Sequence, residues 1–188
     1  METTRVSVGG EQIPVVVGGP ETTHTVMLLG DTGHEPDSFT TVCERLHNSA
    51  LRTIVPQDPA ALDRTTLMGL LDALEIGWVN LVGIDGGAEL AWAVAATQFG
   101  RFASLVVADR GHPAVPDRGG LVRDAACPPV ELPTTVLVSQ PDRAPEARGS
   151  GRFVYADFRM VELAPVAQVP RDAAAELATE ITLRTSPW

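Results

Sequence analysis

The sequence is poor in cysteine and lacks basic clusters, and each shortage excludes a class of function. Cys43 and Cys127 are its two cysteines, and they lie far apart in the sequence rather than in a paired metal-ligand motif. We therefore predict two reduced thiols and no bound metal. Lysine and arginine together number 14, against 24 aspartates and glutamates, and no basic cluster stands out. A nucleic-acid partner is accordingly not expected.

Long apolar runs are also missing. No segment approaches the ~20 apolar residues that a membrane-spanning helix needs. The first ten residues, METTRVSVGG, lack the basic segment and apolar run of a secretory signal. We therefore expect a cytoplasmic protein without a membrane partner. The composition, 44% hydrophobic and 20% charged, is typical of a globular chain, and the length suits one domain spanning residues 1–188.

Segments of strand and helix character alternate along the chain. Two short strands around Gly9-Gly10 predict an N-terminal antiparallel hairpin, and the apolar run TVMLL at 25–29 is typical of a strand buried on both faces. Further strands are predicted at 52–56, 79–84, 103–109, 134–140 and within 152–163, and helices at about 38–48, 63–77, 88–99 and 171–185. This order indicates an α/β fold, a three-layer sandwich whose mainly parallel sheet has helices on both faces.

Ligands of such sheets bind beyond the carboxyl ends of the strands, so the loops at that edge hold the candidate site. The most distinctive loop lies within LVGIDGGAEL, residues 81–90, where Asp85 stands between an apolar strand and a helix of small residues. A strand, Gly-x-Asp-x-Gly and a helix form the pattern of a nucleophile elbow, whose middle residue is strained. Gly83, Gly86 and Gly87 leave the space that a close crossing of strand and helix needs. Asp85 is therefore the leading candidate for a functional residue.

The segment around this elbow resembles a known superfamily. Residues 67–109, LMGLLDALEIGWVNLVGIDGGAELAWAVAATQFGRFASLVVAD, look like the central part of the α/β-hydrolases, and a weaker resemblance covers nearly the whole chain. Most relatives have Ser at the elbow. Asp there is similar to haloalkane dehalogenases and to epoxide hydrolases of this fold, in which it forms an alkyl-enzyme ester. The resemblance implies the α/β-hydrolase fold and a small-molecule substrate.

Two nucleotide-binding patterns are absent. The glycines around Asp85 do not have the Gly-x-Gly-x-x-Gly spacing of a dinucleotide fingerprint, and the P-loop spacing with its lysine is missing as well. We therefore expect no cofactor.

Three departures from the superfamily's pattern bear on the chemistry. The family's general base is a His after the last strand, whereas no His follows His112 in this chain. The loop after the third strand begins Gly30-Asp31-Thr32 rather than His-Gly. Only a short stretch rich in Pro and Gly separates Asp109 from the strand at 134–140, so no helical cap is expected. A carboxylate nucleophile would form an ester, and hydrolysis of that ester needs a base.

Two loop histidines are candidates to replace that base. His34 follows the third strand and His112 follows the sixth, and both loops border the elbow in this fold. Either ring could pair with Asp85, within about 3.5 Å or through one water. The competing interpretation is that both are ordinary exposed residues of turn-forming loops.

Acidic candidates lie in loops at the same edge of the sheet. Asp109 and Asp142 occupy the two positions at which relatives of this superfamily keep the triad acid, and Asp31 lies in the loop after the third strand. Any of the three could orient or tune an Asp–His pair. The predicted catalytic residues are Asp85, His34, His112 and Asp109, and the predicted binding residues are Asp31, Thr32, Ile84, Gly86 and Asp142.

Two functions remain open at this point. The first is a small lidless enzyme in which Asp85 is a general acid/base or a nucleophile, for isomerisation, cyclisation, elimination or epoxide opening. Partial desolvation is expected to raise the pKa of Asp85. Its substrate would be small and largely apolar, since Met27, Leu29, Ile84 and Val107 lie nearby. The second is an inactive relative that serves as a binding or assembly protein, whose exposed apolar surface a homodimer could cover.

Overall fold

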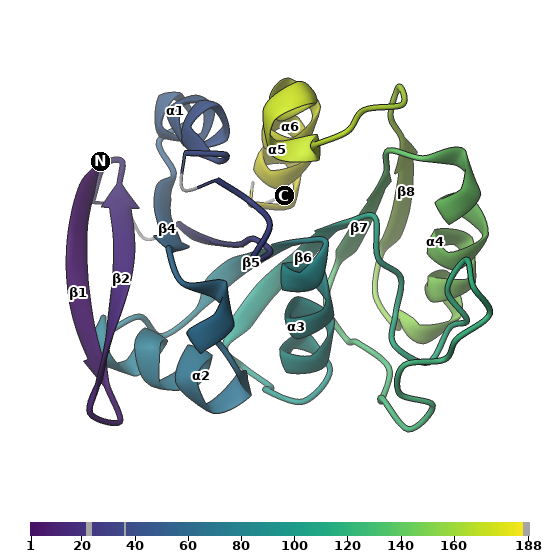
Figure 1. Cartoon of the computed structure of the whole chain (residues 1–188), viewed down its shortest axis with the longest axis horizontal. Coiled ribbons are helices and arrows are strands. Elements are labelled where there is room, and N and C mark those ends of the chain that lie inside the picture. Colours follow the sequence, from purple (N-terminus) through teal and green to yellow (C-terminus); the bar gives the residue numbers. More distant parts are fainter. Residues whose placement is uncertain (22–23, 36, 186–188) are drawn as a thin grey trace.

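A single sheet runs through the computed structural model, which describes residues 1–21, 24–35 and 37–185 (Figure 1). The sheet has eight strands in the order β1-β2-β4-β3-β5-β6-β7-β8. β1 (Glu2–Val8) and β2 (Glu11–Gly18) form an antiparallel hairpin, and β2 also pairs antiparallel with β4. All other neighbours are parallel. The predicted sheet with its N-terminal hairpin is therefore confirmed.

The central strands lie where their apolar runs predict them. The bounds are β3 (Thr25–Leu29), β4 (Arg52–Pro56), β5 (Val79–Ile84), β6 (Phe102–Ala108), β7 (Thr134–Val138) and β8 (Phe158–Glu162). Every residue of β3, β5 and β7 is buried. A strand without an exposed face has no polar alternation, which is why a continuous apolar run encodes it.

Helices cover both faces of the sheet (Figure 1). One face carries α1 (Thr40–Asn48), α5 (Val169–Asp172) and α6 (Ala174–Thr185), and the other carries α2 (Arg64–Ala73), α3 (Gly86–Ala95) and α4 (Ala144–Ser150). Alternate residues of β3 join two separate cores. Val26 and Leu28 pack with the α1 and α6 side, whereas Met27 and Leu29 pack with the α2 and α3 side.

Several helix bounds differ from the predictions. α3 ends at Ala95 rather than at residue 99, and α6 begins at Ala174 rather than at residue 171. Asp37 and Ser38 are of residue types that often cap helices, so either was expected to cap the helix predicted at about 38–48. Neither does, and the N-cap of α1 is Phe39 without a side-chain hydrogen bond. Asp63 does cap α2 by accepting the Thr66 N–H at 2.7 Å, but that helix ends at Ala73 rather than at residue 77. The short helix α4 was not predicted, because its sequence APEARGS contains Pro and Gly and spans only 7 residues.

The connection between β6 and β7 has no helix in residues 109–133. It returns toward the sheet through a single bridge between Val130 and Val154. Across the described part of the chain, every helix is too short or too polar to cross a membrane. Cys43 and Cys127 are buried and free, and burial raises the pKa of both thiols.

Candidate functional site

Asp85 sits at a sharp turn between β5 and α3. Its φ of 52° and ψ of −117° place a non-glycine residue in the left-handed half of backbone space, which costs conformational energy. A Cβ on Gly83 would lie 2.6 Å from the Ala88 Cα, and one on Gly87 would lie 2.2 Å from the Leu29 carbonyl oxygen. Strand and helix therefore cross so closely that only glycine fits at both positions, which gives the geometry of an elbow.

His34 is the histidine that the fold brings to this elbow. Its Nε2 lies 3.4 Å from Oδ2 of Asp85, the long end of a hydrogen-bond contact. Asp85 keeps 34% of its side chain exposed, whereas the His34 ring keeps 10%. On the other side of the ring, the Asp31 backbone N–H donates to Nδ1 at 3.0 Å. The ring also stands edge-on to Phe39, with centroids 6.1 Å apart.

These contacts define what His34 can do. A ring nitrogen that accepts a backbone N–H carries no proton, so the neutral His34 ring has its proton on Nε2 and donates it toward Asp85. The hydrogen bond from His34 is the main cause that lowers the pKa of Asp85, and the charges of Arg110 and Arg143 act in the same direction. The prediction of a raised pKa was wrong, because desolvation of this carboxyl is outweighed by that donor. Asp85 is therefore an ionised carboxylate at neutral pH.

Asp31 lies over the first residue of α3. Its Oδ1 accepts the Thr32 backbone N–H at 2.7 Å and the Thr32 hydroxyl at 3.3 Å. A Cβ on Gly86 would lie 2.7 Å from the same oxygen. In the α/β-hydrolase fold, the residue after the nucleophile and an N–H of the loop after β3 form the oxyanion hole. The carboxylate of Asp31 therefore occupies one N–H of the loop after β3 and lies close to Gly86.

His112, in the loop after β6, is buried. The ring is fully buried, is stacked on Phe153 at 4.5 Å and meets Trp92 edge-on at 5.3 Å. Its Nε2 bonds the Pro128 carbonyl at 3.0 Å, and its Nδ1 accepts the Ala114 N–H at 3.2 Å. Desolvation lowers the pKa of His112, so this ring is neutral. The described contacts of His112 hold the loop together and do not extend to Asp85.

The acidic candidates Asp109 and Asp142 also contact other groups than Asp85. Asp109 is buried, and its carboxylate accepts the Ser139 backbone N–H at 2.8 Å and the Ser139 hydroxyl at 2.5 Å. That pair of bonds ties the end of β6 to the end of β7. Asp142 is 56% exposed and forms a 3.3 Å ion pair with Arg118. Of the predicted residues, the structure thus gathers Asp85, His34, Asp31, Thr32 and Gly86.

The apolar residues expected to line a pocket lie inside the sheet instead. Met27, Leu29, Ile84 and Val107 are each no more than 1% exposed. This happens because helices cover both faces of the central strands, which buries the side chains of those strands. Beside Asp31 and Gly86, a hollow of about 140 Å³ has walls from Pro59, Leu62 and Leu90, among others. This hollow is therefore built from the loop after β3, the segment after β4 and the first turns of α3.

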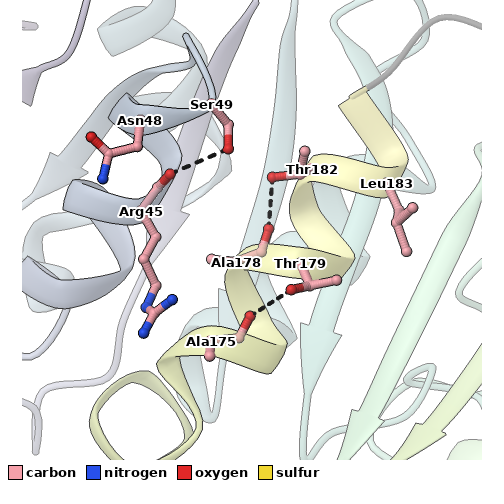
Figure 2. A pocket seen from close by; sticks show the side chains of 8 residues that line it. All are labelled: Arg45, Asn48, Ser49, Ala175, Ala178, Thr179, Thr182 and Leu183. Atoms are coloured by element: carbon pink, nitrogen blue, oxygen red, sulfur yellow. Dashed lines mark hydrogen bonds between the residues drawn. The ribbon is translucent and has the colours of Figure 1, made fainter.

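A second hollow, of about 330 Å³, lies between α1 and α6 (Figure 2). The hydroxyl groups that line it donate hydrogen bonds to backbone carbonyls. Thr179 and Thr182 donate to the Ala175 and Ala178 carbonyls of their own helix, and Ser49 donates to the Arg45 carbonyl, as Figure 2 shows. These hydroxyl groups are therefore engaged within their own helices.

Two arginines affect the elbow electrostatically. Sequence reasoning considered Arg110 as a partner of a buried carboxylate or a substrate anion but favoured a surface role, and it missed Arg143. Arg143, in the turn η2 (Pro141–Arg143) after β7, and Arg110, after β6, both lower the pKa of Asp85. Both follow strand ends at the edge where ligands of such sheets bind, which is the signal that could have found them.

The comparisons with known proteins identify the fold. The chain matches no family model and no curated protein sequence. Its structure is similar to epoxide hydrolase A of Mycobacterium thermoresistibile, with 12% identity, a TM-score of 0.79 and coverage of 97% of each chain. The enol-lactonase of Burkholderia xenovorans is 13% identical, with a TM-score of 0.78 and coverage of 96% of this chain and 99% of the other.

A third similar structure is described as an epoxide hydrolase of the α/β-hydrolase superfamily from metagenomes of hot environments. It is 16% identical, with a TM-score of 0.72 and coverage of 97% of this chain and 98% of the other. Together with the strand order and the elbow, these similarities show that the chain has the α/β-hydrolase fold.

Proposed function

We propose that this chain is an enzyme that opens small epoxides in a single step, with Asp85 as general base. Asp85 takes a proton from a water molecule while the water oxygen attacks a ring carbon and the ring C–O bond breaks. The proton then passes from the carboxyl to the ring oxygen, so the product is a diol and the carboxylate is regenerated. General-base catalysis of this kind contributes about 10²–10⁴-fold to a rate.

One observation carries this proposal. Asp85 is an ionised, partly exposed carboxylate at the elbow, and the Nε2–H of His34 keeps it in that state from 3.4 Å. The similarity of the fold to epoxide hydrolases supports the choice of substrate class.

A covalent mechanism is less well supported by the same site. An alkyl-enzyme ester on Asp85 would need a base to activate water and an oxyanion hole for its hydrolysis. No His follows His112 in the sequence, and the Thr32 N–H of the loop after β3 already donates to the carboxylate of Asp31. The chemistry that fits these residues is proton transfer without an ester intermediate.

The test is a single-turnover reaction in ¹⁸O-water, with enzyme in excess over a panel of small terminal epoxides. A diol that carries ¹⁸O from its first turnover supports attack by water, whereas a first-turnover diol with ¹⁶O, together with an ester on intact mass analysis, refutes the general-base mechanism. Asp85→Asn should lower the rate at least 100-fold. Asp72→Asn is the matched control. Asp72 lies on α2, is 68% exposed and forms an ion pair with Arg101.

The second candidate is an inactive relative that binds or assembles. It is favoured by the structural use of His112 and Asp109, whose side chains hold loops rather than face Asp85. If none of the epoxides is opened and the protein is a dimer in analytical ultracentrifugation, this second function replaces the first.

A further inference from the structure

A cavity of about 420 Å³ lies beside the elbow, and arginines dominate its walls. Its lining comes from α3, from the loop between β6 and β7, and from η2. The lining residues are Glu89, Arg110, Asp117, Arg118, Leu121, Arg123 and Arg143, and we call this cavity the arginine pocket. The sequence contains no lysine, so the 14 basic residues are all arginines, and four of them meet here.

Two of these arginines are already neutralised by acidic residues. Arg123 forms a 2.9 Å ion pair with the buried carboxylate of Glu146 and lies 3.5 Å from Glu89. Arg110 pairs with the same Glu89 oxygen at 3.1 Å. These ion pairs hold the side chains of Arg110 and Arg123 in the wall of the pocket and leave them less able to bind an anion.

The charges of the other two arginines, Arg118 and Arg143, are less neutralised by acidic residues. Arg118 is 58% exposed, and its pair with Asp142 at 3.3 Å is a surface ion pair, which contributes little. Arg143 donates to the Asp109 backbone carbonyl at 2.6 Å. Among the described residues, no carboxylate forms an ion pair with the half-buried guanidinium of Arg143, although its charge acts on Asp85 from a longer distance.

The pocket is also placed to act together with the elbow. Glu89 lies one helical turn after Asp85 on α3, and Arg110 and Arg143 are close enough to Asp85 to act on its ionisation. The volume falls within the range of about 300–1,000 Å³ that is typical of small-molecule sites. Arginine is the residue that best matches the planar oxygens of a carboxylate or phosphate, because its guanidinium can bind two of them at once.

We propose that the arginine pocket binds the carboxylate or phosphate group of a small molecule, with Arg143 and Arg118 as its main ligands. The inference rests on the proposed function where it assigns that anion to the substrate. The anionic end lies in the arginine pocket and the uncharged reactive end lies at Asp85. The substrate is then not apolar throughout, which refines the expectation drawn from the sequence.

The test is isothermal titration calorimetry at low ionic strength with two probes, inorganic phosphate and glutarate, which distinguish the two anionic groups. Arg143→Gln and Arg118→Gln should each weaken binding of the preferred probe about tenfold, because each removes a charge-assisted hydrogen bond. Glu89→Gln should strengthen it, because it removes a negative charge from the wall. Added salt should weaken all of these affinities.

Arg148→Gln is the matched control. Arg148 is 68% exposed, lies on α4 and contacts Glu162 at 3.5 Å, so its loss should leave binding unchanged. Urea unfolding of each variant separates lost binding from lost folding, and Arg118 provides a surface variant in case Arg143→Gln disturbs the Asp109 loop. Opposite effects of Glu89→Gln and Arg118→Gln cannot come from general destabilisation.

Absence of saturable binding of both probes, or an equal loss in Arg148→Gln, overturns the inference. Calorimetry needs no turnover, so its outcome is independent of the epoxide assay. Anion binding without epoxide opening leaves this pocket in place and removes the proposed reaction. Epoxide opening without anion binding leaves the proposed reaction in place and removes the anion site.

Discussion

The close crossing at the elbow makes Gly87→Ala the most direct test of the fold's local geometry. The new Cβ would stand 2.2 Å from the Leu29 carbonyl oxygen and 2.7 Å from the Gly30 carbonyl oxygen. Both are backbone atoms, which cannot rotate away, so the cost lies at the upper end of overpacking, about 3 kcal/mol. Alanine is about 1 kcal/mol better than glycine within a helix. The free energy of unfolding should therefore fall by about 2 kcal/mol, and Tm by roughly 4–8 °C.

The measurement is urea and thermal unfolding followed by circular dichroism, with Gly77→Ala as the matched control. A Cβ on Gly77 meets nothing within 4 Å, so the same chemical change should leave stability unchanged or slightly raised. Equal stability of the two variants would mean that α3 can move away from β3 freely. The elbow would then not be the rigid support that the position of Asp85 requires.

Two further predictions concern pH. His34→Leu removes the donor that lowers the pKa of Asp85, so the acid limb of the epoxide-opening rate should move to higher pH; an unmoved limb would show that His34 does not control this carboxyl. His112 has its pKa lowered from its ordinary 6.5 in the folded state, so the unfolded chain binds more protons as pH falls below that value. Its contribution to stability is full above pH 6.5 and is lost below it. Urea midpoints between pH 8 and 5 should fall less in His112→Gln than in the parent, and parallel curves would contradict this.

Local sequence signals predicted most of the fold, because buried strands consist of apolar residues. β3, β4 and β5 are apolar runs bounded by turn residues, and their predicted ranges agree with the structure. The strained turn at Asp85 was equally visible, because it needs glycines at fixed spacings. Local signals do not encode α4, whose 7 residues are held by tertiary packing.

The roles of the two histidines could not be separated from sequence. His34 and His112 both follow strands that end beside the elbow, and turn-forming residues surround both. What separates them is tertiary: Phe153 and Trp92 enclose one ring, whereas Asp31 turns the other toward Asp85. The direction of the Asp85 pKa shift depends on that same contact, so burial alone predicted the wrong sign.

Asp31 has one more consequence for how this chain relates to ester-cleaving proteins of the same fold. Hydrolysis of an ester releases a carboxylate, and Asp31 holds a carboxylate against Thr32 N–H and Gly86 through its own backbone. The chain thus carries its own carboxylate at the Thr32 N–H, as an intramolecular group that cannot diffuse away. An ester or lactone substrate that used the Thr32 N–H would have to displace this carboxylate, whereas a reaction that forms no oxyanion there would not.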